Sequence, residues 1–268
     1  MQDTYQRDRL LHLGMLAGTF LIIHTLFTLY VRPRADSWVS EQREAIAADP
    51  KHVPTGSFWV IIKDYEQEAA IISAFWAVGL SMMKFAAVRR QRKPLAAAEI
   101  GVPAGIRVLP QDVREWTRQL ENLPADQRNL LLPRVMERAL KRFGETRDVQ
   151  DASTTVHDFC ESEMGRLDSE LAPVRFSVWA IPAIGFVGTV RGIGHALRGA
   201  QLAFEGDTSA VTGGLGISFN STFTALTLSI IVMYILHEVQ LAQERLVLDA
   251  EQYVDDHLIQ HLQAPDQP

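Results

Sequence analysis

The sequence has little of the chemistry that catalysis or metal binding requires. Its single cysteine, Cys160, excludes an intramolecular disulfide and a cysteine-based metal cluster. It shows no nucleophile–base pair, no metal-ligand spacing and no phosphate-binding loop, so we expect neither an enzyme nor a cofactor. Lys and Arg number 26 against 32 Asp and Glu, and the net charge of −6 argues against nucleic-acid binding through bulk positive charge.

Charged residues are also absent from two long stretches. Residues 10–31 and 208–237 carry no Asp, Glu, Lys or Arg over 22 and 30 positions. An uncharged, mostly apolar run of about 18 or more residues can cross a hydrocarbon core of roughly 30 Å as a helix. The mean hydropathy of +0.00 therefore averages membrane-spanning segments with a charged aqueous part, which argues against a soluble globular protein.

Two shorter runs bring the number of predicted spans to four. Residues 69–83 and 176–190 hold 15 uncharged positions each, and they reach spanning length only if Lys84 and Arg191 snorkel or face protein or water. The first long run exceeds the apolar core of a signal peptide and is followed by basic residues, so we interpret it as a retained helix. The prediction is an all-α polytopic membrane protein with four transmembrane helices and a helical cytoplasmic domain.

The distribution of Lys and Arg sets the orientation in the lipid bilayer. Residues 89–175 hold 15 of them and residues 32–68 hold five, so the positive-inside rule places 89–175, and with it both termini, in the cytoplasm. The predicted organisation is the N-terminus and first span at 1–31, an outer loop at 32–68, the second span at 69–88, the cytoplasmic helical domain at 89–175, the third span at 176–198, an outer linker at 199–213, the fourth span at 214–237 and a cytoplasmic C-terminal helix at 238–268.

The aqueous parts also show helical patterns. Apolar residues recur three or four positions apart over 110–123 and again over 124–144, and cap-type residues from Asp151 start a further helix. Residues 238–262 extend the fourth span with leucines and valines among acids. The outer loop carries Trp38 and a Ser-Phe-Trp sequence, which predict short interfacial helices with aromatic anchors.

The third and fourth spans are rich in small and hydroxyl-bearing residues. Gly185, Gly188 and Gly192 allow close approach of another helix, and Pro182 can kink the third span. The fourth span has two small or polar faces at helical spacing, formed by Ser218, Thr222, Ala225 and Ser229 and by Asn220, Thr224 and Thr227. Each hydroxyl alone can simply bond back to its own helix, but the set facing glycines favours a lined pathway.

These residues resemble a known family. The pattern Pro182-x-x-Gly-Phe-x-Gly-Thr-Val-x-Gly-Ile193, then an outer linker and a Thr222-bearing last span, is similar to the MotA/TolQ/ExbB proton-channel family over roughly residues 175–240. The resemblance implies a homopentamer in the bacterial inner membrane around two single-span subunits of the MotB/TolR/ExbD kind. Ion flow would turn one ring against the other, with Thr189 and Thr222 as pore threonines beside an Asp of the partner.

The layout of the chain differs between branches of that family. Four spans are closer to MotA than to the three-span ExbB, and Ile217 lies near the place where the ExbB/TolQ branch carries a Glu. None of the four predicted spans contains an interior Asp or Glu, although a proton relay normally needs ionisable groups. We therefore expect this chain to supply hydroxyl and amide lining and the partner to supply the titrating carboxylate.

The predicted ion pathway consists of Thr189, Thr222, Asn220, Ser221 and Ser218, with Pro182 and the three glycines shaping it. The transported ion is expected to be H⁺, and Na⁺ stays open because hydroxyls serve both. We interpret Arg191 as an interfacial snorkelling residue or half of an interprotomer ion pair, with gating as the alternative. His195, near the outer end, is an alternative proton-uptake group.

Two other functions are compatible with the same residues. A secondary transporter would pass a substrate between the Gly- and Thr-rich helices, although no inverted repeat or intramembrane charge pair is visible. A membrane scaffold would use these helices for assembly alone and would carry no ion flux with any partner. A neighbouring gene for a short, single-span protein with an Asp near the start of its helix would favour the motor.

Overall fold

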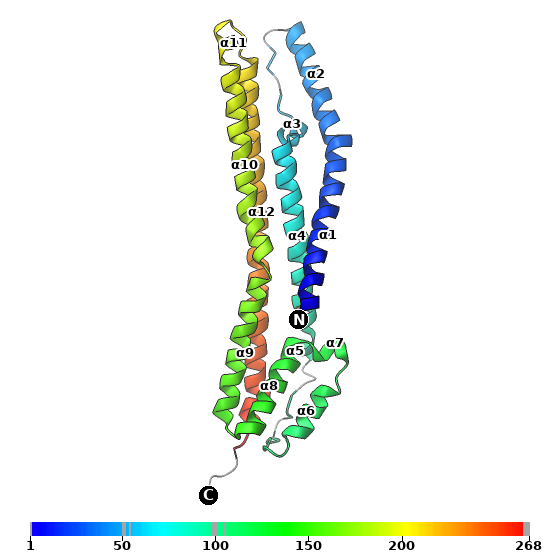
Figure 1. The fold of residues 1–268 in the computed structure, drawn as a ribbon, viewed down its shortest axis with the longest axis vertical. Helices are drawn as coiled ribbons and strands as arrows, with labels where there is room; N and C mark the ends of the chain where they lie inside the picture. The colour runs from blue at the N-terminus through cyan, green and yellow to red at the C-terminus, as the bar shows by residue number, and fades with distance from the viewer. Residues whose placement is uncertain (1, 50–51, 54, 98–100, 104, 265–268) are drawn as a thin grey trace. The chain divides into compact units, whose positions relative to one another are not determined.

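The computed structural model describes residues 2–49, 52–53, 55–97, 101–103 and 105–264. Within this part every regular element is a helix (Figure 1), which confirms the predicted all-α class. Four helical stretches in it are long and apolar enough to cross a membrane, as the charge-free runs predict: Leu10–Ala48, Tyr65–Leu95, Val149–Arg198 and Ser209–His261.

The chain divides into two compact units. The apolar unit comprises residues 1–81 and 173–236, and the polar unit comprises residues 82–172 and 237–268. The helices of the apolar unit are α1 (Gln2–Leu26), the π-helix η1 (Phe27–Val31), α2 (Arg32–Ala48), α3 (Phe58–Ile62), most of α4 (Tyr65–Gln91), α10 (Ala172–Arg198), α11 (Ala200–Phe204) and the first part of α12 (Ser209–His257).

The first helix continues beyond the predicted end of its span at residue 31. α1, η1 and α2 follow one another without a loop as far as Ala48, where the sequence predicts only short interfacial helices. Pro33 lies in the first turn of α2, where a proline lacks the N–H that a regular helix needs, and the π-turn comes directly before it. The charge at Arg32 thus marks the end of the apolar run but not the end of the helix.

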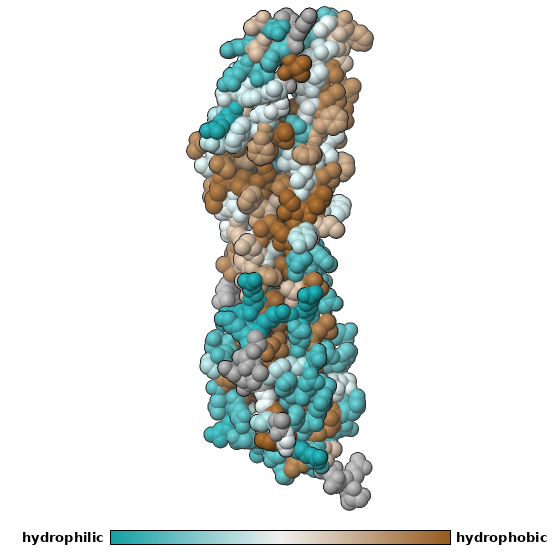
Figure 2. All heavy atoms as spheres, turned by 180° about the vertical axis from the view of Figure 1, so that it is seen from behind, coloured by the Kyte–Doolittle hydropathy of each residue, from teal (hydrophilic) through white to brown (hydrophobic). Residues whose placement is uncertain are grey.

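Large apolar side chains lie on the outside of the apolar unit. They form the brown surface in the space-filling view (Figure 2), whereas the polar unit is mainly hydrophilic there. The most exposed include Leu29, Trp179, Val190, Phe219 and Ile230. A monomeric soluble protein rarely exposes a continuous apolar surface of this kind, so lipid or further subunits must cover it.

The polar unit has a core of its own. Its helices are the end of α4, α5 (Lys93–Ala97), α6 (Val113–Glu121), α7 (Ala125–Arg128), α8 (Leu131–Thr146), α9 (Val149–Ser169), the second part of α12 and the 3-10 helix η2 (Ile259–His261). Leu132, Phe143, Leu246 and Leu258 are fully buried in this core. Cys160 packs there too, and burial raises the pKa of its thiol to about 12, so it stays protonated and unreactive.

Candidate ion pathway

Three glycines of α10 allow α12 to pack directly against its backbone. A Cβ at Gly188 would overlap the side chain of Ser221, and one at Gly185 would overlap the Cβ of Ala225. A Cβ at Gly192 would meet the hydroxyl of Ser218. The three glycines that predict close approach therefore form the contact between α10 and α12. Any larger residue at these positions would push the two helices apart.

The proline of α10 creates a bonding site for a serine of α12. Pro182 has no N–H, so the carbonyl of Val178, four residues earlier, loses its partner in the helix. The hydroxyl of Ser229 donates to that Val178 oxygen at 3.1 Å. In an apolar environment an unpaired carbonyl is costly, so the serine compensates for the proline.

The two threonines predicted to line the pathway are in direct contact. The hydroxyls of Thr189 on α10 and Thr222 on α12 lie 2.5 Å apart, and both residues are half-buried. The Thr189 hydroxyl is also 3.2 Å from the Gly185 carbonyl, to which it can donate if Thr222 donates to it. A hydroxyl can donate and accept at the same time, so this pair can meet either form of a carboxyl group.

The neighbouring polar residues of α12 have different roles. Ser218 is buried, and its hydroxyl lies 3.0 Å from the Thr189 carbonyl and 3.2 Å from the Gly214 carbonyl, so it also fastens the two helices. Ser221 is buried against α10 and donates back to the Ile217 carbonyl at 2.8 Å. Asn220 is half-buried, and its side chain makes no hydrogen bond with a described residue. The structure therefore joins Thr189, Thr222 and Ser218 and leaves Asn220 outside this group.

Arg191 is paired within its own chain. Its guanidinium lies 2.6 and 2.8 Å from the two carboxylate oxygens of Glu66 and 3.5 Å from Asp64. This bidentate geometry gives directional hydrogen bonds as well as charge neutralisation. The sequence left open whether Arg191 snorkels to the interface, pairs with another protomer or acts in gating. In the structure its ion-pair partners lie in the same chain. His195 is exposed on α10 and makes no side-chain hydrogen bond with a described residue.

The comparison with known families agrees with this geometry. Residues 127–252 match the model of the MotA/TolQ/ExbB proton channel family. Over this range the chain is similar to that family. No curated protein matches the chain. The matched range includes Pro182, the three glycines and both threonines.

The match to the MotA/TolQ/ExbB family supports a coarse assignment. Its members are proton channels rather than enzymes, and they act in complexes with partner subunits. Together with the four membrane-spanning helices, the family match identifies a multi-pass membrane protein that serves as a proton-channel subunit.

Acidic residues outside the matched range form the part of the site that sequence reasoning missed. Glu66 and Glu68 lie in the first turn of α4. Glu68 is buried and pairs with Arg32 and, at 2.7 Å, with His24, while Glu66 takes Arg191. The sequence predicts that the second span starts only at residue 69, so it places these two acids in the outer loop. Their position just before an apolar run, where a helix N-terminus favours negative charge, is the signal that could have found them.

Proposed function

We propose that this chain is the channel-forming subunit of a rotary motor in the bacterial inner membrane. Five copies would surround two single-span partner subunits, each with an Asp in its membrane helix, and would convert the proton-motive force into mechanical work. Both termini would lie in the cytoplasm. The observation that carries the proposal is the paired hydroxyl of Thr189 and Thr222 between two helices whose apolar runs contain no carboxylate.

The acids that the structure adds do not take over the role of the partner's Asp. Glu66 and Glu68 lie before the uncharged run of α4, and both are already engaged by cations. A carboxylate inside the membrane must therefore come from another subunit in this proposal. That requirement favours a motor stator over a scaffold, which needs no titrating group.

The threonine pair suits a carboxyl group that changes its protonation. An ionised partner Asp would accept a hydrogen bond from one hydroxyl while the other donates within the pair, whereas a protonated one would donate a bond to either of them. Ion passage would thus exchange hydrogen bonds rather than break them. One elementary charge moving through 100 mV releases about 2.3 kcal/mol, which is several times the thermal energy and biases a step between equivalent positions of a ring.

The test replaces each pathway threonine with the isosteric valine. We expect Thr189→Val and Thr222→Val to lower partner-dependent proton influx by about tenfold or more, since a lost hydrogen bond to a charged group costs about 1.5–3 kcal/mol. Influx is measured with a pH-sensitive dye in vesicles that hold the chain and its partner. Thr227→Val is the matched control, because Thr227 is an exposed threonine of the same helix. Wild-type influx in both pathway variants would contradict the proposal.

A further inference from the structure

One charged residue interrupts the two uncharged runs that hold the ion pathway. Over 176–197 and 208–237, Arg191 is the only residue among Asp, Glu, Lys and Arg. It lies two residues beyond Thr189 on α10, which is about 3 Å further along the helix axis and about 200° around it. The guanidinium is therefore outside the contact between the two threonines but close to their level.

A positive charge at that level opposes the passage of a cation. Coulomb forces need no contact, and buried charges are screened much less than charges in water. At roughly 10 Å and an effective dielectric constant of about 20, one unit charge changes the occupancy of a second charge by about tenfold. An arginine beside a pore can exclude protons and other cations in this way. A proton pathway beside Arg191 therefore needs a counter-charge.

The structure supplies that counter-charge at the start of α4. The carboxylate of Glu66 lies 2.6 and 2.8 Å from the Arg191 guanidinium, and that of Asp64 lies 3.5 Å from it. The two acidic side chains are only 12% and 17% exposed, so water screens them little. Packing brings α4 and α10 together here, since a Cβ at Gly188 would lie 3.4 Å from the Cβ of Glu66. Two carboxylates and one guanidinium give this cluster a formal charge of −1.

The third acid at the start of α4 belongs to a different set of charges. Glu68 lies two positions beyond Glu66, about 200° around α4, and it pairs with Arg32 and His24. The first turn of α4 thus carries acids on two sides. Only the acids that pair with Arg191 lie beside the pathway helix α10.

We propose that Glu66 and Asp64 are the counter-charge that lets a cation move along α10 past the level of Arg191. They act through Arg191 and not on the ion itself, so they are positioning residues of the pathway. The inference rests on the proposed proton influx. It adds to the pathway two residues that lie outside the matched range of 127–252.

The test varies the charge of the cluster separately from its ion pairs. Glu66→Gln brings the formal charge from −1 to 0 and keeps Asp64 beside Arg191. The double variant Asp64→Asn/Glu66→Gln brings the charge to +1, and adding Arg191→Gln returns it to 0 without restoring an ion pair. Proton influx is measured per assembled complex in vesicles that hold the chain and its partner. We expect the double variant to pass about tenfold less than the triple variant, which differs from it by one charge.

The outer pH gives an independent readout. An unneutralised guanidinium favours the ionised form of a nearby carboxyl group, so a lower outer pH is needed to protonate an Asp of the partner. We expect half-maximal influx of the double variant about one pH unit below that of the triple variant. The other charged or titratable groups around the cluster stay the same in both variants: Lys63, Glu68, Arg32, His24, His195 and Arg198. Residues 208–236 of the neighbouring α12 region contain no Asp, Glu, Lys, Arg or His.

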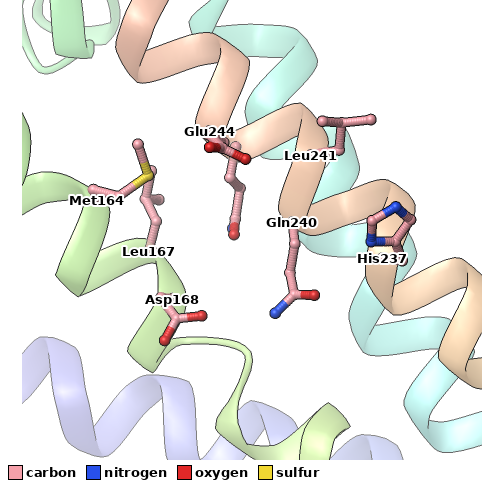
Figure 3. A pocket seen from close by; sticks show the side chains of 8 residues that line it. Met164, Leu167, Asp168, His237, Gln240, Leu241 and Glu244 are labelled. Atoms are coloured by element: carbon pink, nitrogen blue, oxygen red, sulfur yellow. The ribbon is translucent and has the colours of Figure 1, made fainter.

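The matched control makes the same substitution in the polar unit. Glu244 lines a pocket of about 400 Å³ there, together with Gln240 and Asp168 (Figure 3). Glu244→Gln removes one acid from the chain, as Glu66→Gln does, but leaves the charge beside Arg191 unchanged. We expect wild-type influx and wild-type pH dependence for this control.

Three outcomes would decide against a proposal. Equal influx in the double and triple variants would overturn the counter-charge, because the ion pairs would then matter only as a contact between helices. Glu66→Gln alone keeps one ion pair and should pass about tenfold less than the wild type, so wild-type influx in this variant would also overturn it. A wild-type complex without partner-dependent influx would instead overturn the proposed function.

Discussion

At the scale of single residues, space at the α10–α12 contact decides which substitutions the chain tolerates. Gly188 and Gly194 lie on the same helix, but only a Cβ at Gly188 meets another side chain. The structure thus separates glycines that are needed for helix packing from glycines with open space around them. The sequence pattern alone does not make this distinction.

Gly188→Ala should destabilise the helix pair by about 1–3 kcal/mol, because the added methyl overlaps Ser221 and forces the helices apart. The midpoint of thermal unfolding in detergent should fall accordingly. Gly194→Ala is the control, with open space around its Cβ, and should leave the midpoint unchanged. Equal midpoints for the two variants would show that the contact with Ser221 is not as close as described.

The proline of α10 makes a second residue-scale prediction. Ser229→Ala leaves the Val178 carbonyl without a donor and should cost about 1 kcal/mol, as a lost hydrogen bond between membrane helices does. In a Pro182→Ala background the restored N–H can bond to the same carbonyl, so Ser229→Ala should then cost less. Unfolding free energies of the four variants measure this coupling, and strictly additive costs would refute it.

At the scale of elements, charge-free runs predict where helices cross the membrane but not where they end. The runs of 22 and 30 residues identify two spans, and the shorter runs identify the others. The continuation of the first helix to Ala48 was not predictable in this way, since a helix needs intact backbone hydrogen bonds, not apolar side chains. The amphipathic periods predicted over 110–123 and 124–144 likewise correspond to α6 and α8, with shorter bounds.

Contacts between helices also differ in how far the sequence predicts them. Thr189 and Thr222 could be brought together by reasoning, because glycine spacing and helical period fix the faces of α10 and α12. The pair of Glu66 and Arg191 could not, since 125 positions separate the two residues and no local pattern links them. The sequence therefore left the partner of Arg191 open.

At the scale of the whole molecule, the exposed apolar surface requires lipid or further subunits to cover it. We expect the chain purified with its partner to form complexes of five copies to two. Cryo-electron microscopy in lipid nanodiscs would count the subunits directly. Two copies or a lone chain in every particle class would contradict the motor, even if the complex were stable.

The serine hydrogen bonds of α12 also determine how α12 is aligned along α10. Ser218 and Ser229 are eleven residues apart, and their acceptors on α10, the carbonyls of Thr189 and Val178, are also eleven residues apart. Eleven residues are about three helical turns, so the two antiparallel helices are joined at two matched points. A slip of one residue would rotate both hydroxyls by about 100° and break both bonds together. These two bonds therefore hold α10 and α12 as one unit, and in the proposed motor any rotation would be absorbed between neighbouring helix pairs.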